Sequence, residues 1–367
     1  MNELVLRGGR VLRDDAWVRG EVVCRDGHVT DDPPTGDATV VDVTGRLVAP
    51  GLVDLQCNGA LGIDLAADPE RLWELGTGLA RWGVTSWLPT IVTTPDGVID
   101  RALAVLAAGP PDGWLGARPL GLHLEGPFLS PTTRGAHPEA LLRLPAGDLA
   151  KDWSRAAGVA LVTMAPDLPG ADELQRDLLA RGVVVSLGHT PATAQEATAA
   201  VDAGARWVTH LFNAMAPLHH REPGLAGVAL TDDRLHVGLI ADGIHVHPTV
   251  VRMAQQALGA RLTLVTDAVA ALGAAAGESA SDGVRLRDGT LAGSVLSLDQ
   301  AIRNLVAYTG CSTAAAVAAA TAAPARVLGA DDLGHLEPGA RADIVVLTED
   351  LHVVTTYAAG QQIHQHG

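Results

Sequence analysis

Polar side chains whose types suit metal-assisted hydrolysis follow several short apolar runs of this sequence. Glu125, His189 and His210 each end a separate run. Two imidazole nitrogens and one carboxylate oxygen form a known ligand set for catalytic Zn²⁺, with a fourth position left for water. We therefore expect one divalent metal ion per subunit, with zinc favoured and iron, manganese or cobalt as alternatives.

Asp267 ends a further apolar run, directly after Val265 and Thr266. A carboxylate at this position could take a proton from an activated water and return it to a leaving group. Aspartate is also a favoured N-cap residue of helices. The residues alone leave both interpretations of Asp267 open.

The elements that would position these side chains follow a repeated pattern of short apolar runs and helix-like segments. The runs cover residues 52–55, 86–92, 120–124, 160–164, 183–187, 207–212, 237–240 and 262–265, and helix-like segments include 69–82, 172–181 and 191–203. Eight such units predict an α/β fold with a (β/α)8 TIM-like barrel. Polar residues at the run ends support it, because the carboxyl ends of barrel strands converge on one face. A doubly wound sheet is the alternative, but no G-x-G-x-x-G turn follows the first run.

Both ends of the chain have a different pattern, in which short apolar pieces alternate with turn signals. Residues 3–43 predict a small antiparallel β-structure, and 343–347 and 353–355 predict further strands. Neither piece can bury a sheet alone, so we expect the two termini to pair. The predicted domains are a small β-sandwich from residues 1–48 plus 330–367, and a metal-dependent barrel from residues 49–329.

Composition excludes several classes of function. The 367 residues include 42 acidic and 26 basic side chains, a net charge of −16 that disfavours nucleic acid and anionic lipid as partners. No run of about 18 apolar residues could span a membrane, and the start lacks a signal-peptide pattern, so we predict a cytoplasmic protein. The three cysteines lack CxxC spacing and are expected to be reduced thiols.

Several strings of the sequence, in order, carry a family resemblance. They are APGLVD (49–54), HLEGPF (123–128), GHT (188–190), THLFNAM (209–215), REPGLAG (221–227), ADGIH (241–245), VTDA (265–268), LAGS (291–294) and LEPGARAD (336–343). The first resembles the entry motif of the amidohydrolase superfamily. The whole series resembles that of the N-acetylglucosamine-6-phosphate deacetylases.

The resemblance implies metal-dependent hydrolysis of the N-acetyl group of N-acetyl-D-glucosamine 6-phosphate, giving D-glucosamine 6-phosphate and acetate in amino-sugar catabolism. Glu125, His189 and His210 would bind the metal, and Asp267 would be the catalytic acid and base. His137 would help to stabilise the oxyanion. The residues that would hold the sugar phosphate are His137, Asn213, Ala214, Arg221, His245, Leu291, Ala292 and Gly293. Family members commonly form homodimers in which the loop with the Arg221 equivalent reaches the neighbouring subunit's site.

Two further features favour one metal ion over two. Many amidohydrolases carry His-x-His on the first strand, whereas this chain has Gln56 and Asn58, whose amides are poor zinc ligands but can position a water. Cys57 should point to the opposite side of the strand and pack there. The only lysine, Lys151, precedes the fourth run at an expected helix end, where it is a surface charge and not a carboxylated metal bridge.

Two alternative functions remain open at this point. The substrate could be another N-acyl compound, with N-acetylgalactosamine 6-phosphate and N-acetylmannosamine 6-phosphate the nearest. The chain could also be a catalytically silent barrel that binds a sugar phosphate. That alternative predicts loss of the proton-transfer carboxylate or of metal ligands, and all four of these residues are present.

Overall fold

The computed structural model describes residues 3–145, 148–274 and 283–366, and most of them form a barrel of parallel strands. The eight strands are β8 (Leu52–Cys57), β11 (Val84–Val92), β13 (Leu122–Glu125), β14 (Val159–Met164), β15 (Val184–Leu187), β16 (Trp207–Val208), β17 (His236–Leu239) and β18 (Leu262–Leu264). Each strand overlaps one predicted run, so the predicted barrel is confirmed. The strands are almost wholly buried, as β14 is at all six positions, because helices cover the outer face of a parallel barrel.

The barrel closes through backbone beyond the end of β18. The Asp267 amide donates to the Gln56 carbonyl at 2.9 Å, and the Asn58 amide donates to the Ala268 carbonyl at 2.8 Å. These bonds continue β18 alongside the end of β8 and close the ring between the first and last strands. Closure therefore brings Gln56, Asn58 and Asp267 together, although more than 200 residues separate them in the sequence.

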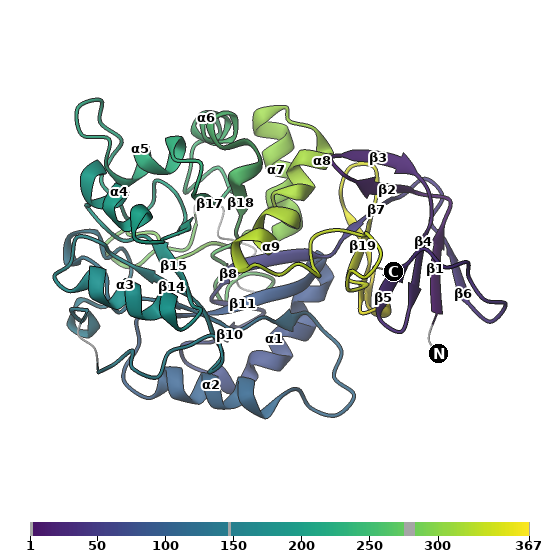
Figure 1. Cartoon of the computed structure of the whole chain (residues 1–367), viewed down its shortest axis with the longest axis horizontal. Coiled ribbons are helices and arrows are strands. Elements are labelled where there is room, and N and C mark those ends of the chain that lie inside the picture. Colours follow the sequence, from purple (N-terminus) through teal and green to yellow (C-terminus); the bar gives the residue numbers. More distant parts are fainter. Residues whose placement is uncertain (1–2, 146–147, 275–282, 367) are drawn as a thin grey trace.

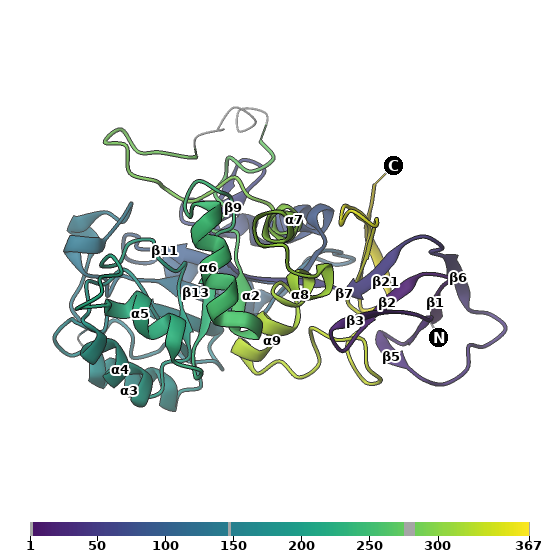
Figure 2. The ribbon, with the colours of Figure 1, turned by 90° about the horizontal axis from the view of Figure 1, so that it is seen from above.

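Helices surround the barrel, as Figures 1 and 2 show from two directions. They are α1 (Leu72–Leu79), α2 (Val98–Ala108), α3 (Ala171–Ala180), α4 (Ala194–Asp202), α5 (Gly224–Thr231), α6 (Pro248–Leu258), α7 (Leu298–Thr309), α8 (Thr313–Ala318) and α9 (Ala322–Leu328). The predicted helical segments correspond to α1 with its flanking 3-10 turns, to α3 and to α4. Local sequence sets the start of α4, where Thr193 and Glu196 form a reciprocal capping box.

Both ends of the chain form two sheets at the right-hand side of Figure 1. The four-stranded sheet has the order β5 (His28–Thr30), β4 (Val22–Arg25), β1 (Glu3–Arg7) and β6 (Thr39–Asp42). The six-stranded sheet has the order β21 (Gln361–Gln365), β20 (Val353–Ala358), β19 (Ile344–Leu347), β7 (Leu47–Pro50), β2 (Arg10–Arg13) and β3 (Ala16–Arg19). One apolar cluster, with side chains from both sheets, fills the space between them. The antiparallel pairing of β7 with β19 confirms the expected pairing of the termini.

The prediction of an antiparallel structure from residues 3–43 is wrong in one pairing, and a second parallel pairing reaches beyond that range. β1 pairs with β6 in parallel, and β2 pairs with β7 in parallel. The reason is that the chain changes sheets between these strands. Strands β1, β4, β5 and β6 belong to one sheet and β2, β3 and β7 to the other, so long connections and not hairpins join β1 to β6 and β2 to β7. Turn signals in the sequence mark the strand ends but do not indicate which sheet each strand joins.

The six-stranded sheet also packs against the barrel. Leu47 and Val345 belong to the same apolar cluster as the barrel strands, and the Thr356 hydroxyl donates to the Ala80 carbonyl at 2.9 Å. Strand β7 crosses the predicted boundary at residue 48, and the division at 48/49 and 329/330 stays a prediction. The remaining short strands are β9 (Gly59–Ala60), β10 (Ile63–Asp64) and β12 (Arg118–Pro119).

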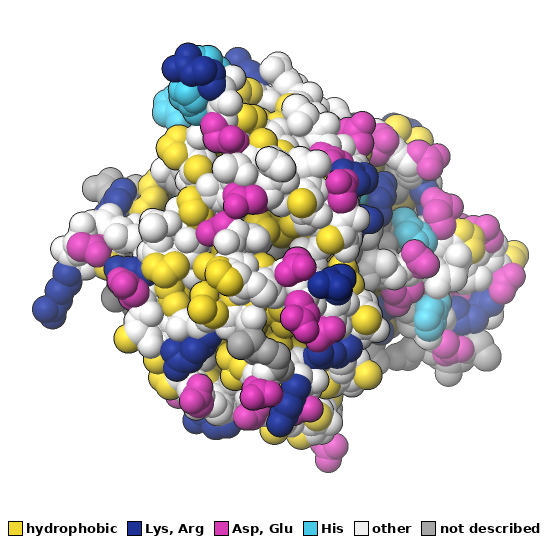
Figure 3. Space-filling view, turned by 60° about the vertical axis from the view of Figure 1, so that its left-hand side comes forward, with side chains coloured by type: hydrophobic (Ala, Val, Ile, Leu, Met, Phe, Trp, Pro, Cys, Tyr) yellow, Lys and Arg dark blue, Asp and Glu magenta, His cyan; other side chains and the backbone are white. Residues whose placement is uncertain are grey.

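The structure also bears on the predictions for the cysteines, the only lysine, membrane spans and surface charge. Cys24, Cys57 and Cys311 are free thiols. Lys151 is exposed ahead of β14, but it lies in a turn and not at a helix end. Among the described residues, no helix combines the length and the apolar character that crossing a membrane requires. On the described part of the face in Figure 3, acidic and basic side chains are interspersed and form no continuous basic area.

Candidate active site

The four residues predicted to carry the chemistry lie together at the carboxyl ends of the barrel strands. Glu125 is the last residue of β13, and His189, His210 and Asp267 follow β15, β16 and β18 within three residues. These three have left-handed backbones, with φ of 51°, 28° and 48°. Such values are unfavourable for residues with a Cβ and cluster at functional sites.

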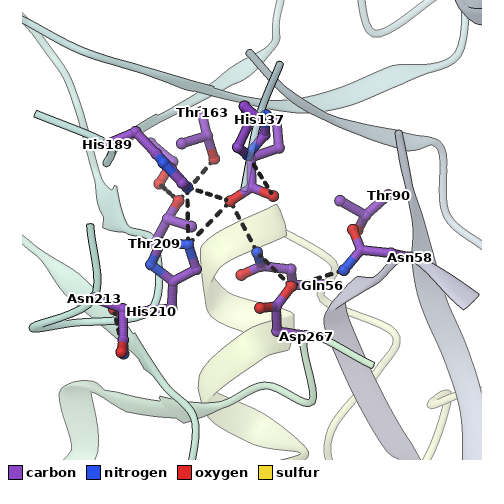
Figure 4. Close-up of polar contacts among 12 residues, drawn as sticks. Gln56, Asn58, Thr90, His137, Thr163, His189, Thr209, His210, Asn213 and Asp267 are labelled. Carbon is purple, nitrogen blue, oxygen red and sulfur yellow. Dashed lines mark hydrogen bonds and ion pairs between the residues drawn. The ribbon is translucent and has the colours of Figure 1, made fainter. Parts of the chain in front are cut away.

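Glu125, His189 and His210 form a compact buried group. Oε1 of Glu125 lies 3.1 Å from Nε2 of His189 and 3.1 Å from Nε2 of His210, and the two histidine nitrogens are 3.1 Å apart. Figure 4 shows the two imidazoles converging at this point. Among the described residues, these three side chains form the one group of three or more candidate ligands that lie close enough together to hold a metal ion.

The hydrogen bonds around this group fit a divalent cation. Nδ1 of His189 lies 3.2 Å from the Thr133 carbonyl, which only accepts, so Nδ1 carries the proton and Nε2 presents a lone pair. Three ligand atoms about 3 Å apart can share one divalent cation. A tetrahedral ion about 2.0–2.2 Å from each ligand places the ligand atoms roughly 3.3 Å apart, close to the separations found here.

Glu125 and His210 shift each other's pKa. Burial alone would raise the pKa of Glu125, but the hydrogen bonds and charges of His189 and His210 outweigh it and hold this pKa well below its usual range. Burial acts to lower the pKa of His210, and Glu125 reverses the effect and raises it. Glu125 is therefore an anion in the barrel mouth, which favours a cation among the three side chains.

Asp267 lies beside this group and is held by two amides of β8 and its continuation. Its Oδ1 accepts from Nδ2 of Asn58 at 2.7 Å and from Nε2 of Gln56 at 3.2 Å. Gln56 also donates to Oε1 of Glu125 at 3.0 Å, so one amide links both carboxylates. Burial and the charge of Glu125 raise the pKa of Asp267 to about 6, a value suited to proton transfer near neutral pH. Asp267 is not a helix N-cap, because a non-helical backbone follows it.

The amides of Gln56 and Asn58 are the groups predicted to position a water. Both donate through nitrogen to carboxylates, and their carbonyl oxygens, Oε1 and Oδ1, are buried without a hydrogen-bond partner among the described residues. Cys57 is fully buried, and its amide nitrogen donates to Oγ1 of Thr90 at 3.0 Å. The group of candidate metal ligands does not include this cysteine.

One cavity of about 750 Å³ opens over these side chains. Besides Asn58 and the four residues above, the lining includes these residues from the predicted substrate site: His137, Asn213, Ala214, His245, Leu291, Ala292 and Gly293. The structure thus gathers all but one of the predicted substrate-binding residues around a single cavity. A volume of this size accommodates a small phosphorylated sugar.

His245 is fixed in the wall of the cavity by Asp242. Nδ1 of His245 lies 2.6 Å from Oδ2 of Asp242, and Oδ1 accepts the backbone amides of Ile244 and His245 at 2.8 Å each. Burial acts to raise the pKa of Asp242, but the bonds from His245 and these amides outweigh it and lower the pKa. Nδ1 of His245 therefore donates to a carboxylate.

Arg221 is the predicted substrate-binding residue that does not line the cavity of its own chain. It is exposed on the loop 216–223, where NH1 contacts Nε2 of His220 at 2.9 Å and the backbone amide donates to Nδ1 of His219 at 3.3 Å. Its proposed contact with a phosphate therefore needs either a movement of the loop or a second copy of the chain.

Sequence reasoning missed several residues that the structure places at the site. Thr133 orients His189 through its backbone carbonyl, which no side-chain pattern reveals. Asp64 and Arg285 line the cavity from segments that the pattern of barrel runs does not include. Thr93 directly follows the run 86–92, a position that by itself indicates no role, and it contacts His137.

Comparison with known proteins agrees with this architecture and site. Residues 47–363 match the model of the amidohydrolase family. The chain is 41% identical to human N-acetylglucosamine-6-phosphate deacetylase, over 98% of this chain and 94% of the human one. It is 40% identical to N-acetylgalactosamine-6-phosphate deacetylase of Escherichia coli O157:H7, over 97% and 98% of the two chains.

A solved structure supports the same relationship. The structure of a variant N-acetyl-D-glucosamine-6-phosphate deacetylase from Mycobacterium smegmatis, in complex with N-acetyl-D-glucosamine-6-phosphate, superposes with a TM-score of 0.88. It is 34% identical and covers 99% of this chain and all of its own. The chain therefore belongs to the amidohydrolase family, in the branch that contains the N-acetylglucosamine-6-phosphate deacetylases.

Proposed function

We propose that this protein hydrolyses the acetamide of N-acetyl-D-glucosamine 6-phosphate with the help of one divalent metal ion, in amino-sugar catabolism. The observation that carries the proposal is the convergence of Glu125, His189, His210 and Asp267 on one cavity. Deacetylases of this substrate are related to the chain over nearly its whole length. Water adds across the amide C–N bond, giving acetate and D-glucosamine 6-phosphate.

The residues of the chain have separable roles in this reaction. A divalent ion held by Glu125, His189 and His210 would supply Lewis-acid activation of a water and of the acetyl carbonyl. Asp267 accepts the proton of the attacking water and then protonates the leaving amine. The amides of Gln56 and Asn58 hold Oδ1 of Asp267, so the proton is carried on Oδ2.

The proposed metal is zinc, and the proposed sugar-phosphate site is the remainder of the cavity wall. Two imidazoles and a carboxylate favour zinc, with iron, manganese and cobalt as alternatives. Asn213, Ala214, His245 and the backbone of residues 291–293 surround the part of the cavity beyond the candidate ligands. Donor groups there would bind the hydroxyls and the phosphate of the substrate.

A second candidate substrate is N-acetylgalactosamine 6-phosphate, because an N-acetylgalactosamine-6-phosphate deacetylase is 40% identical to this chain. The test is acetate release from the gluco, galacto and manno epimers of N-acetylhexosamine 6-phosphate, and from their unphosphorylated forms. We expect the highest kcat/KM for the gluco 6-phosphate. A higher value for the galacto epimer would move the assignment to that substrate.

Arg221 is proposed to bind the substrate phosphate in the site of a second subunit, within a homodimer. Arg221→Ala should raise KM for N-acetylglucosamine 6-phosphate by roughly 10- to 100-fold, the value of one charge-assisted hydrogen bond. KM for unphosphorylated N-acetylglucosamine should change little. Steady-state kinetics on both substrates test this, with Arg176→Ala, an exposed arginine on α3, as the matched control. An equal effect on both substrates would show that Arg221 does not bind the phosphate.

The same variant tests the dimer. Arg221→Ala and Asp267→Asn subunits, unfolded together and refolded as a mixture, should regain part of the activity at low substrate concentration. The reason is that a mixed dimer has one site with Asp267 from one subunit and Arg221 from the other. No gain over the separate variants would contradict the arrangement. The cytoplasmic location inferred from the sequence stays a prediction.

A further inference from the structure

Thr93 makes two contacts with one ring nitrogen of His137. Thr93 follows β11 and is 4% exposed, and His137 is 6% exposed. The Thr93 backbone amide donates to Nδ1 of His137 at 3.3 Å, and the Thr93 hydroxyl lies 2.9 Å from the same nitrogen. Both groups thus lie on the side of the imidazole opposite Nε2.

These contacts determine which nitrogen of His137 carries the proton. A backbone amide can only donate, so Nδ1 must present its lone pair. An imidazole that accepts a hydrogen bond at Nδ1 can carry a proton only on its other nitrogen. A neutral imidazole has one proton, which must then be on Nε2.

The protonated nitrogen faces the candidate metal group. Nε2 of His137 is 3.7 Å from Oε2 of Glu125, and the His137 ring is 4.6 Å from that of His189 between centroids. Figure 4 shows His137 and His189 on the same side of the site. An N–H directed into this part of the cavity can donate to an oxygen that gains negative charge during amide hydrolysis.

The position of the Thr93 hydroxyl is itself restricted. It lies 3.4 Å from the Glu125 carbonyl, and Gly126, with φ of 87°, follows Glu125. A Cβ at Gly126 would overlap Oγ1 of Thr93, so the glycine leaves room for this hydroxyl. The backbone that carries the metal ligand Glu125 and the residue that orients His137 are therefore packed against each other.

We propose that Thr93 is a positioning residue that holds His137 in the tautomer with its proton on Nε2, so that His137 donates a hydrogen bond to the acetyl oxygen of the substrate. This inference rests on the proposed deacetylase function for the identity of the acceptor. Thr93 acts through His137 and does not itself contact the reacting atoms.

The test compares three variants at two neighbouring threonines. Thr93→Val removes only the hydroxyl and should lower kcat by roughly 10- to 100-fold, the usual effect of losing an outer partner, with KM nearly unchanged. Thr93→Ser keeps the hydroxyl and should retain most of kcat. Thr94→Val is the matched control, because the Thr94 hydroxyl is buried without a hydrogen-bond partner among the described residues, and kcat should stay near wild type.

Two further measurements separate positioning from general damage. In a His137→Gln background, Thr93→Val should cause little additional loss, since its effect passes through the imidazole. The ¹⁵N chemical shifts of the His137 ring should show a protonated Nε2 and a bare Nδ1 in the wild type, and a mixture of tautomers in Thr93→Val.

An unchanged kcat in Thr93→Val, an equal loss in Thr93→Ser, or a proton on Nδ1 in the wild type would overturn the inference. The tautomer measurement needs no substrate. A wild-type protein that released no acetate would therefore contradict the proposed function, whereas the chemical shifts would still test the role of Thr93.

Discussion

Asp267→Asn is expected to lower kcat for N-acetylglucosamine 6-phosphate by on the order of 10²- to 10⁴-fold, because the chain loses the group that accepts and returns the proton. The substitution keeps the shape of the side chain. Its Oδ1 can still accept from Asn58 and Gln56, so the amide cradle is preserved. KM and the amount of bound metal should stay near wild type. Steady-state kinetics and elemental analysis of the purified variant measure these quantities.

The control for this variant is Asp172→Asn, which removes the same charge from an exposed position on α3. It should leave kcat unchanged. Substantial turnover by Asp267→Asn would contradict the acid and base role. Loss of metal together with activity would instead indicate that Asp267 supports the metal group.

Glu125→Gln is expected to remove both the metal and the activity. Glu125 is the one anionic side chain among the three candidate ligands, and an uncharged amide is a poor ligand for zinc. Loss of an outer partner of a metal ligand typically costs 10- to 100-fold in metal affinity, so loss of this ligand should cost more than about 100-fold. Metal content after dialysis and kcat at saturating added metal both test the expectation.

Glu173→Gln, at an exposed position of α3, is the matched control and should keep both metal and activity. If Glu125→Gln bound metal as tightly as the wild type, the proposed ligand set would be wrong. Circular dichroism of the variant checks folding, because replacing a buried carboxylate can also change stability.

The barrel and the metal group were predictable from local sequence. Each apolar run could be recognised as a buried strand, and parallel strands of one barrel place their carboxyl ends on one face. It followed that the residues after the runs, Glu125, His189 and His210, would meet. Predicting that these three residues meet required only the order of strands and helices along the chain.

Other features could not be predicted because they depend on backbone groups and pairings distant in sequence. Closure between β8 and the continuation of β18 determines that Asn58 reaches Asp267. The Thr133 carbonyl and the Thr93 amide set the tautomers of His189 and His137, and backbone groups leave no trace in residue type. The phosphate contact of Arg221 involves a second chain in the proposal, so one sequence cannot locate it.

In the proposed reaction, acetate release from N-acetylglucosamine 6-phosphate requires a metal ion held by Glu125, His189 and His210. The most direct measurement is acetate release by one preparation as purified, after removal of metal with a chelator, and after readdition of a divalent ion. We expect activity in the first state, loss of activity in the second and recovery in the third. Undiminished release from metal-free protein, or no release from the metal-loaded protein, would contradict it.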